Sequence, residues 1–464
     1  MKKLLSENIL VLLTAPVLIN YLFNLYQGQN NLIFFYIDNK FHFFSLILSS
    51  AFFYFISKEI KVIFKINSLC LALSYFLTSF FLIDFLFMFV NNFIDLGRTE
   101  SHNFVLLSWL FLLIYKKIRF NSAFFLIISY SVLVVSNNYF YEKIKFLGNY
   151  IELNTDVNYQ WFELSEKLYS QGLFEAFTNN VIEGQGLYLS YIQSLIFKLN
   201  FPLNDFEFIR VNSGIFLIFA FFIFFDLKIN RKNKYLISIL FFTVILNSDW
   251  LSYLFIDSLM LEGIASFTIC SFLINFKKYE NKNIKLRSFI YFLFFGCLLM
   301  SKQFISTIAF LFIIYSLFVN RNINSLASFF IYFLNRFYLN YFVGESSSFE
   351  YLDGRNVTDL LFDLITLNNL DFSVIKNIID ELLKDRIVSF LFIVFILLNL
   401  INIYQKDKSD MEYFYVVLLN LIFINILYIS WWKNIEIQSS YRYFLNFLHV
   451  LFVSIAVKSN NLPK

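Results

Sequence analysis

Charged residues are scarce in this chain, and so are proline and glycine. Asp, Glu, Lys and Arg make up 15% of the 464 residues, whereas hydrophobic residues make up 59% and the mean hydropathy is +0.65. A soluble domain carries about 25% charged and about 45–50% apolar residues. A water-soluble fold could not hide this much apolar surface. The composition therefore predicts an all-α integral membrane protein whose solvent is lipid.

Cysteine and histidine are too few and too scattered to indicate a metal centre or a disulfide framework. The chain has 3 of each, far apart from one another: Cys70, Cys270, Cys297, His42, His102 and His449. The cysteines all lie inside apolar runs, where a free thiol behaves as a small hydrophobic side chain. No carboxylate pair has the spacing of metal ligands. The sequence thus implies no metal or other cofactor, although a divalent cation is compatible with it. The net charge of +4 does not indicate a nucleic-acid partner.

Apolar runs separated by short polar loops predict a polytopic bundle of roughly fourteen transmembrane helices. About five of these helices fall in an N-terminal part, residues 1–138. A transmembrane core follows at 207–343, and three final helices occupy 387–464. Two longer polar segments separate these parts, at 139–206 and 344–386.

Lys and Arg clusters orient the predicted helices, because cytoplasmic loops carry an excess of them. With the N-terminus in the cytoplasm, the clusters at 58–65, 228–234 and 277–287 all fall on the cytoplasmic side, as does Arg321. Because successive transmembrane helices alternate in direction, this orientation places both longer segments outside the cytoplasm. It also places two hairpin tips there, Asn247-Ser248-Asp249-Trp250 and Ser301-Lys302-Gln303.

The first outer segment, 139–206, contains two stretches with helical spacing of apolar residues. Residues 156–171 and 187–199 each present a broad apolar face, and the turn Glu183-Gly184-Gln185-Gly186 separates them. Both are predicted to be amphipathic helices that lie on the membrane surface. The second outer segment is mixed in charge, and we expect it to be partly helical.

Ionisable residues near hydrocarbon are costly, so each requires a reason. At the predicted outer face these residues are Asp156, Asp249, Asp257, Lys302 and Arg442. Asp156 could be a helix N-cap, a general base, or both. Asp257 could be hydrogen-bonded to a neighbouring helix, and so could Glu262 deeper in the same span. Lys302 and Arg442 could extend to the interface without a partner. Each position alone is therefore a weak indication of function.

Together with their neighbours, these residues resemble GT-C glycosyltransferases that use polyprenyl-phosphate sugars, such as protein mannosyltransferases and aminoarabinose transferases. The first extracytoplasmic loop of that family has an acidic residue, an aromatic residue, a turn of small residues and the sequence Pro-Pro-Leu-Tyr. The matching residues here are Asp156, Tyr159-Gln160-Trp161-Phe162, Leu173-Phe174 and Glu183-Gly184-Gln185-Gly186-Leu187-Tyr188. Leu187-Tyr188 is retained, while Gln185-Gly186 replaces the two prolines.

Three later motifs follow in the order of the family. Asp257 is similar to an acidic residue that opens a span, and Leu299-Met300-Ser301-Lys302 is similar to a hairpin turn with lysine. Ser440-Tyr441-Arg442-Tyr443-Phe444-Leu445 resembles a late Arg-Tyr-Leu-Leu-Pro motif without its proline. The resemblance covers about residues 154–320 and the final span.

One departure from the family pattern is that about five spans precede the acidic loop, which usually follows the first span. An alternative resemblance is to O-antigen or exopolysaccharide polymerases, whose loops can also read Asp-x-x-x-Tyr. Those enzymes depend on extracytoplasmic arginines, for which Arg210, Arg355 and Arg442 are candidates. The chain has no clear paired-arginine motif.

The GT-C resemblance implies an inverting transfer of a sugar from a polyprenyl-phosphate donor to a lipid or glycan acceptor. Asp156 would then take the acceptor proton, and Asp257 would orient the acceptor or Asp156. Lys302 and Arg442 would stabilise the leaving phosphate. Substrate binding would fall to Tyr159, Tyr188 and Tyr443. The expected location is a bacterial inner membrane, with the site facing the periplasm or the cell exterior.

Two rival classes remain. A multi-pass transporter or flippase would have helices broken by Gly or Pro and charges midway through its spans, whereas here Pro16 is the only proline within a predicted span. A non-enzymatic scaffold would leave the charges at the outer face unexplained. A nucleotide-sugar enzyme is excluded, because no predicted cytoplasmic loop exceeds about 15 residues.

Overall fold

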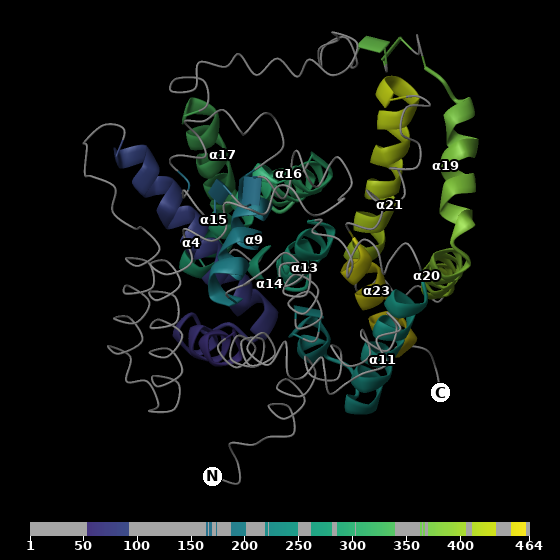
Figure 1. The fold of residues 1–464 in the computed structure, drawn as a ribbon, viewed down its shortest axis with the longest axis horizontal. Helices are drawn as coiled ribbons and strands as arrows, with labels where there is room; N and C mark the ends of the chain where they lie inside the picture. The colour runs from purple at the N-terminus through teal and green to yellow at the C-terminus, as the bar shows by residue number, and fades with distance from the viewer. Residues whose placement is uncertain are drawn as a thin grey trace, which may run out of the picture. The chain divides into compact units, whose positions relative to one another are not determined.

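The fold is all-helical wherever the computed structural model describes the chain (Figure 1). The described residues are 53–91, 164–165, 167–168, 173, 187–200, 219–220, 222–248, 261–280, 285–301, 303–338, 362–363, 365–366, 370–404, 411–432 and 447–460. No strand occurs within these ranges. The chain divides into two compact units, which are Met1–Val181, Leu187–Asp226 and Ser252–Tyr279 for unit 1, and Ile182–Gly186, Leu227–Leu251 and Glu280–Lys464 for unit 2.

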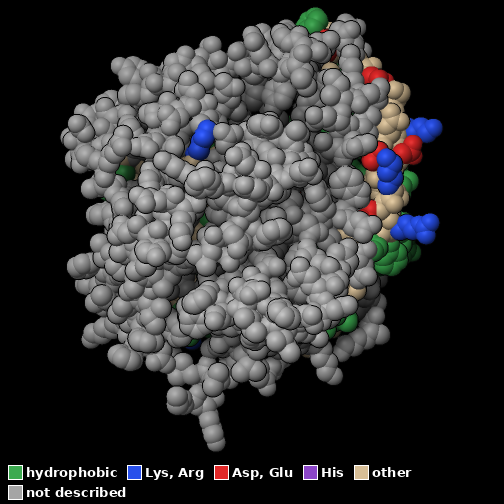
Figure 2. All heavy atoms as spheres, in the orientation of Figure 1, with side chains coloured by type: hydrophobic (Ala, Val, Ile, Leu, Met, Phe, Trp, Pro, Cys, Tyr) green, Lys and Arg blue, Asp and Glu red, His purple; other side chains and the backbone are tan. Residues whose placement is uncertain are grey.

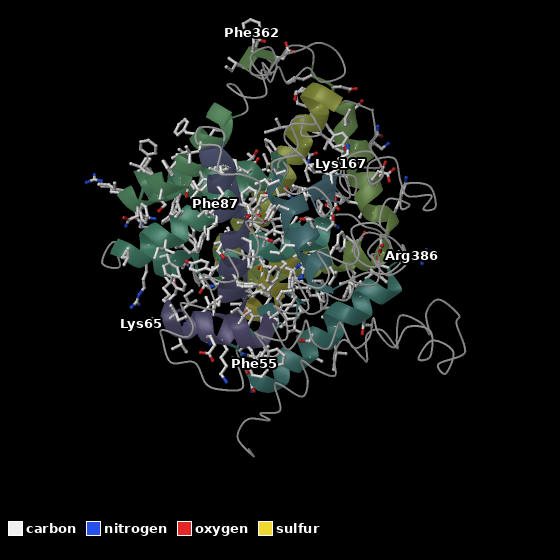
Figure 3. All side chains as sticks on the ribbon, turned by 60° about the vertical axis from the view of Figure 1, so that its left-hand side comes forward. Phe55, Lys65, Phe87, Lys167, Phe362 and Arg386 are labelled. Atoms are coloured by element: carbon white, nitrogen blue, oxygen red, sulfur yellow. The ribbon has the colours of Figure 1, made fainter. Side chains whose placement is uncertain are left out.

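Unit 1 is organised around α4 (Leu69–Asn91), which packs against α9 (Leu187–Asn200) and α13 (Glu262–Leu273). The short helix α14 (Phe276–Glu280) follows α13. The helix at 53–63 ends before α4 at Lys65, whose positive φ of 51° closes the turn while the N–H of Ile66 donates to the carbonyl of Lys61 at 2.9 Å. Figure 3 labels Lys65 at this turn and Phe87 near the far end of α4.

The described residues of unit 2 also form helices. They are α11 (Arg231–Asn247), α15 (Lys285–Gly296), the 3₁₀ turn η4 (Cys297–Met300), α16 (Gln303–Phe318), the 3₁₀ turn η5 (Ile323–Ser325), α17 (Leu326–Tyr338), α19 (Ser373–Lys384), α20 (Arg386–Tyr404), α21 (Met411–Leu427), the π-helical turn η7 (Tyr428–Trp432) and α23 (Leu448–Asn460).

Two helical stretches in the described part of the chain are long and apolar enough to cross a membrane, Leu69–Phe87 and Tyr413–Ser430. Eight further apolar helices there are shorter, with 10–17 residues. The predicted first, fourth and fifth spans, at about 8–26, 104–115 and 122–135, lie outside the described residues.

The prediction for residues 187–199 was right about the helix and wrong about its place. α9 forms there, but every side chain from Leu187 to Phe197 is buried, so the helix does not lie on a surface. Three of its polar side chains, those of Tyr188, Tyr191 and Gln193, are hydrogen-bonded to other segments; for example, Ser165 Oγ donates to Gln193 Oε1 at 2.6 Å. Of the other predicted surface helix, only 164–165 and 167–168 are described, and they are helical.

The second outer segment is partly helical, as predicted, because it contains α19. Val374 and Ile378 are buried on one side of this helix, and it packs against α20 and η7. The Asp371 carboxylate stands just before α19 and accepts from the N–H and hydroxyl of Ser373, at 3.0 and 2.6 Å. Charged side chains cover the opposite side of the helix, at the right edge of Figure 2.

Small residues let α15 and α17 approach closely, which is a common device in membrane helix pairs. Gly296 ends α15 directly against the backbone of Ser328 in α17, and the Ser328 hydroxyl donates to the carbonyl of Phe292 one turn earlier. A Cβ at position 296 would stand 2.6 Å from the Ser328 Cα and carbonyl oxygen. This contact leaves no room for a side chain.

Gly296→Ala is therefore expected to destabilise unit 2, by about 1–3 kcal/mol, because the two helices must move apart. Thermal unfolding of the detergent-purified protein measures this loss. Leu286→Ala, on the exposed side of the same helix, is the control and should change stability by less than about 0.5 kcal/mol. Equal unfolding temperatures for Gly296→Ala and the parent would show that α15 and α17 are not in this contact.

Candidate functional site

All but one of the predicted site residues lie outside the described part of the chain. These are Asp156, Tyr159, Asp257, Lys302, Arg442 and Tyr443. Their roles remain predictions from the sequence. The described residue, Tyr188, belongs to the Leu-Tyr motif of the first outer loop and lies in the second residue of α9.

Tyr188 lies in the interior of unit 1. Its side chain is 1% exposed, and its hydroxyl is hydrogen-bonded to Thr78 Oγ1 of α4 at 2.6 Å. The ring packs edge-on against Phe81, with 5.2 Å between ring centroids. This placement gives Tyr188 a structural role between two helices, and it does not support the predicted role in substrate binding.

One turn further along α9, the hydroxyl of Tyr191 donates to the carboxylate of Asp84, also on α4. Asp84 is 2% exposed, and the Tyr191 ring packs edge-on against Phe81 at 5.3 Å. Two tyrosines of α9 thus bracket one phenylalanine of α4 and bond to polar groups on either side of it. We call Thr78, Phe81, Asp84, Tyr188 and Tyr191 the α4–α9 contact.

A second buried acid in unit 1 is Glu262, which is the first residue of α13 and is fully buried. An acidic side chain is favoured in the first turn of a helix, because the helix N-terminus carries partial positive charge. On the same helix, the hydroxyl of Ser271 is hydrogen-bonded to that of Ser74 in α4. Polar contacts with α4 therefore extend from α9 to α13.

Asp226 binds the start of α4. Its carboxylate accepts from Ser68 Oγ at 3.0 Å and from the backbone N–H of Cys70 at 2.6 Å. Burial raises the pKa of the Asp226 carboxyl, while the backbone N–H groups of Leu69 and Cys70 oppose that rise. The arrangement satisfies N–H groups that a helix N-terminus leaves without an intrahelical partner.

The helical path is interrupted where the hairpin turn before Lys302 was predicted. η4 ends at Met300, Ser301 has an extended backbone and is buried, and α16 begins at Gln303. Lys302 itself lies outside the described residues. Within the described ranges, no group of three or more His, Cys, Asp or Glu side chains could hold a metal ion.

Sequence reasoning missed Asp84 and Tyr191. A signal was present, because Asp84 is the only Asp, Glu, Lys or Arg among the 23 residues of α4. An acid inside an apolar span marks a functional or structural site by default. Its partner could not be found in the same way, since Tyr191 is 107 residues away in the chain.

Comparison of the chain with protein-family models, with curated proteins and with solved structures found no match.

Proposed function

We propose that this chain is a polytopic membrane glycosyltransferase. It transfers a sugar from a polyprenyl-phosphate donor to a lipid or glycan acceptor, at the periplasmic or outer face of a bacterial inner membrane. The order of the motifs that resemble GT-C enzymes, from Asp156 to Arg442, carries the enzymatic part of this proposal. The exposed apolar helix faces of unit 2 support the membrane part.

α20 illustrates these faces. Phe390, Ile393 and Leu397 point away from the rest of the protein and are 65%, 53% and 52% exposed. The polar Asn399 is instead fully buried, and its side-chain amide donates to the carbonyl of Phe395 at 2.8 Å and to Ser454 of α23 at 3.4 Å. A helix that is apolar outside and polar inside is suited to lipid and not to water.

The same arrangement recurs on neighbouring helices of unit 2. Large apolar side chains are exposed on α16, α17 and α21: Phe310, Phe318, Leu326, Phe330, Phe333, Tyr415, Leu418 and Ile422. Exposed apolar patches of this extent are unusual in soluble monomers. If lipid surrounds these helices, the exposure of all these apolar side chains has a single explanation.

Four hydrogen bonds support the predicted topology, because each joins residues that the charge rule places on one side of the membrane. On the predicted cytoplasmic side, Ser68 pairs with Asp226 and Ser288 pairs with Asn322. On the predicted outer side, Ser248 pairs with Asp385, and the N–H of Asp371 donates to the carbonyl of Ile429. Each pair lies within one of the two units. A miscount by one span between the two partners of a pair would have placed them on opposite sides of the membrane.

In the proposed reaction, Asp156 removes the proton of the acceptor hydroxyl or amine as that group attacks the anomeric carbon. The bond from this carbon to the phosphate oxygen breaks, the configuration inverts, and the polyprenyl phosphate leaves. Lys302 and Arg442 stabilise the negative charge on the phosphate. Asp257 orients the acceptor or Asp156. The predicted topology places these four residues at one membrane face.

A second candidate is a transporter or flippase, and the burial of Asp84 and Glu262 within apolar helices favours it. Buried acids inside spans mark ion or substrate paths in many transporters. The charged residues that the sequence alone assigns to the predicted outer face favour the enzyme. The polymerase alternative has no structural observation of its own among the described residues.

Purified protein in liposomes, supplied with radiolabelled polyprenyl-phosphate sugars and envelope lipids, tests the proposal. Labelled sugar on an acceptor lipid or glycan would support a transferase. Movement of the labelled lipid between leaflets without any such product would support the flippase and overturn the proposal. Heat-denatured protein in the same liposomes provides the background for both readouts.

A further inference from the structure

The α4–α9 contact fixes the direction of α9 relative to α4. On α9, Tyr191 lies three residues after Tyr188. Their partners on α4 follow in the same order, because Tyr188 is hydrogen-bonded to Thr78 and Tyr191 to Asp84, which lies six residues after Thr78. Phe81 touches both tyrosine rings from between these points. Later residues of one helix therefore meet later residues of the other, so the two helices run in the same sense along this contact. Figure 1 shows α9 beside α4.

These pairings also fix the level along α4 at which α9 begins. Thr78 is the middle residue of Leu69–Phe87, one of the two stretches able to cross a membrane. At 1.5 Å per residue it lies about 14 Å along the axis from either end. Because Tyr188 is the second residue of α9, this helix begins at the level of the middle of α4.

The surroundings of α9 suit a position inside the membrane. Side chains from Leu187 to Phe197 are all buried, and α9 packs against α13 as well as α4. A helix that begins at membrane depth is tolerated only where protein or a water-filled cavity surrounds its end. Three buried polar side chains of α9, those of Tyr188, Tyr191 and Gln193, are hydrogen-bonded to other helical segments of unit 1, at Thr78, Asp84 and Ser165.

We infer that α9 is a re-entrant helix of the first outer loop, which starts near mid-membrane and rises along α4. We further infer that Asp84 and Tyr191 are positioning residues that hold it there. The second part rests on the proposed function, since α9 directly follows in sequence Glu183-Gly184-Gln185-Gly186, the predicted turn of the candidate loop. On this account, an N-terminal helix outside the family pattern serves to anchor the loop.

Cysteine labelling tests the position of α9 without any transfer assay. Ser190, which is fully buried on α9, is replaced by Cys in full-length protein whose three native cysteines are replaced by Ala. In native membranes, this cysteine should react with a membrane-impermeant maleimide only after denaturation. Tyr191→Phe or Asp84→Leu should speed its labelling by about tenfold, because the contact opens more often. The control Tyr315→Phe removes an exposed tyrosine hydroxyl from α16 and should leave the rate unchanged.

Rapid labelling of Ser190→Cys in the background that lacks the native cysteines, without any further substitution, would overturn the inference, since it would place α9 at a surface. Equal labelling rates with and without Asp84→Leu would remove the positioning role from Asp84. Both outcomes are independent of the proposed transferase activity.

The transfer assay then tests positioning itself. Asp84→Leu should lower kcat by about tenfold or more while the KM for donor changes little, because a displaced loop misplaces reacting groups without removing donor contacts. Asp84→Asn still offers an acceptor to the Tyr191 hydroxyl and should restore most of the rate. Transfer by Asp84→Leu at the parent rate would refute the positioning role. Absence of transfer from every variant, parent included, would refute the proposed function and leave the labelling result standing.

Discussion

Replacing Asp156 by Asn is expected to lower the rate of sugar transfer by about 10²–10⁴-fold, because general-base catalysis contributes about that factor. Asn has nearly the same shape as Asp and still accepts a hydrogen bond, but it cannot take the acceptor proton. The folded protein and its amount in the membrane should therefore be unchanged. The rate of labelled product formation per milligram of purified protein measures the effect.

Glu152→Gln, four residues earlier in the same outer segment, is the matched control for this experiment. It removes one negative charge from the segment but no residue of the motif, and it should retain the parental rate. Full activity in Asp156→Asn would show that Asp156 is only a helix cap. Loss of activity in both variants to the same extent would point to the charge of the segment and away from a specific base.

An arginine at position 397 is expected to prevent much of the protein from inserting correctly. Leu397 is 52% exposed on α20, and water-exposed positions of soluble proteins tolerate such changes within about 0.5 kcal/mol. If α20 faces lipid, arginine near the middle of the helix costs about 2.5–3.5 kcal/mol. The fraction of protein that resists alkaline extraction from membranes should fall accordingly.

Asp380→Arg provides the control, because it places the same side chain at an exposed position on the charged side of α19 (Figure 2). This variant should insert as well as the parent protein. Equal insertion of Leu397→Arg and Asp380→Arg would indicate that the exposed side of α20 faces water, and the membrane part of the proposal would then be wrong.

For the described residues, the helical type of the fold could be predicted from the sequence, because in lipid an apolar run of this length would satisfy its backbone groups only as a helix. α4 lies in the part of the chain, 1–138, for which about five helices were predicted, and α20 and α21 lie in the C-terminal part, for which three were predicted. The turn at Ser301 was also predictable, since a short polar group interrupts two apolar runs there.

The position of α9 could not be predicted in the same way. Serine, glutamine and tyrosine on one helix are equally compatible with water and with polar partners inside a bundle. The partners of Tyr188 and Tyr191 lie on α4, 110 and 107 residues earlier, and nothing local in the sequence identifies them. The spacing of apolar residues alone favours a helix on the membrane surface. The hydrogen bonds of α9 to α4 instead hold it in the interior of unit 1.

The contact at Gly296 is similar in kind. A glycine within an apolar run can mark a close helix approach, a bend or neither. Only the position of the Ser328 backbone shows that the approach is the reason. For the candidate site, the sequence identifies residue types and their order, and the distances between Asp156, Asp257, Lys302 and Arg442 require an experiment.

Cysteine labelling of Asp156→Cys and Arg442→Cys tests the central claim most directly, namely that the reacting groups share the outer membrane face. In intact spheroplasts of cells that make a variant with its native cysteines removed, both positions should react with a membrane-impermeant maleimide added outside. Reaction of one position only after the membrane is opened would put the base and the phosphate-binding arginine on opposite sides. The proposed transferase site would then not exist.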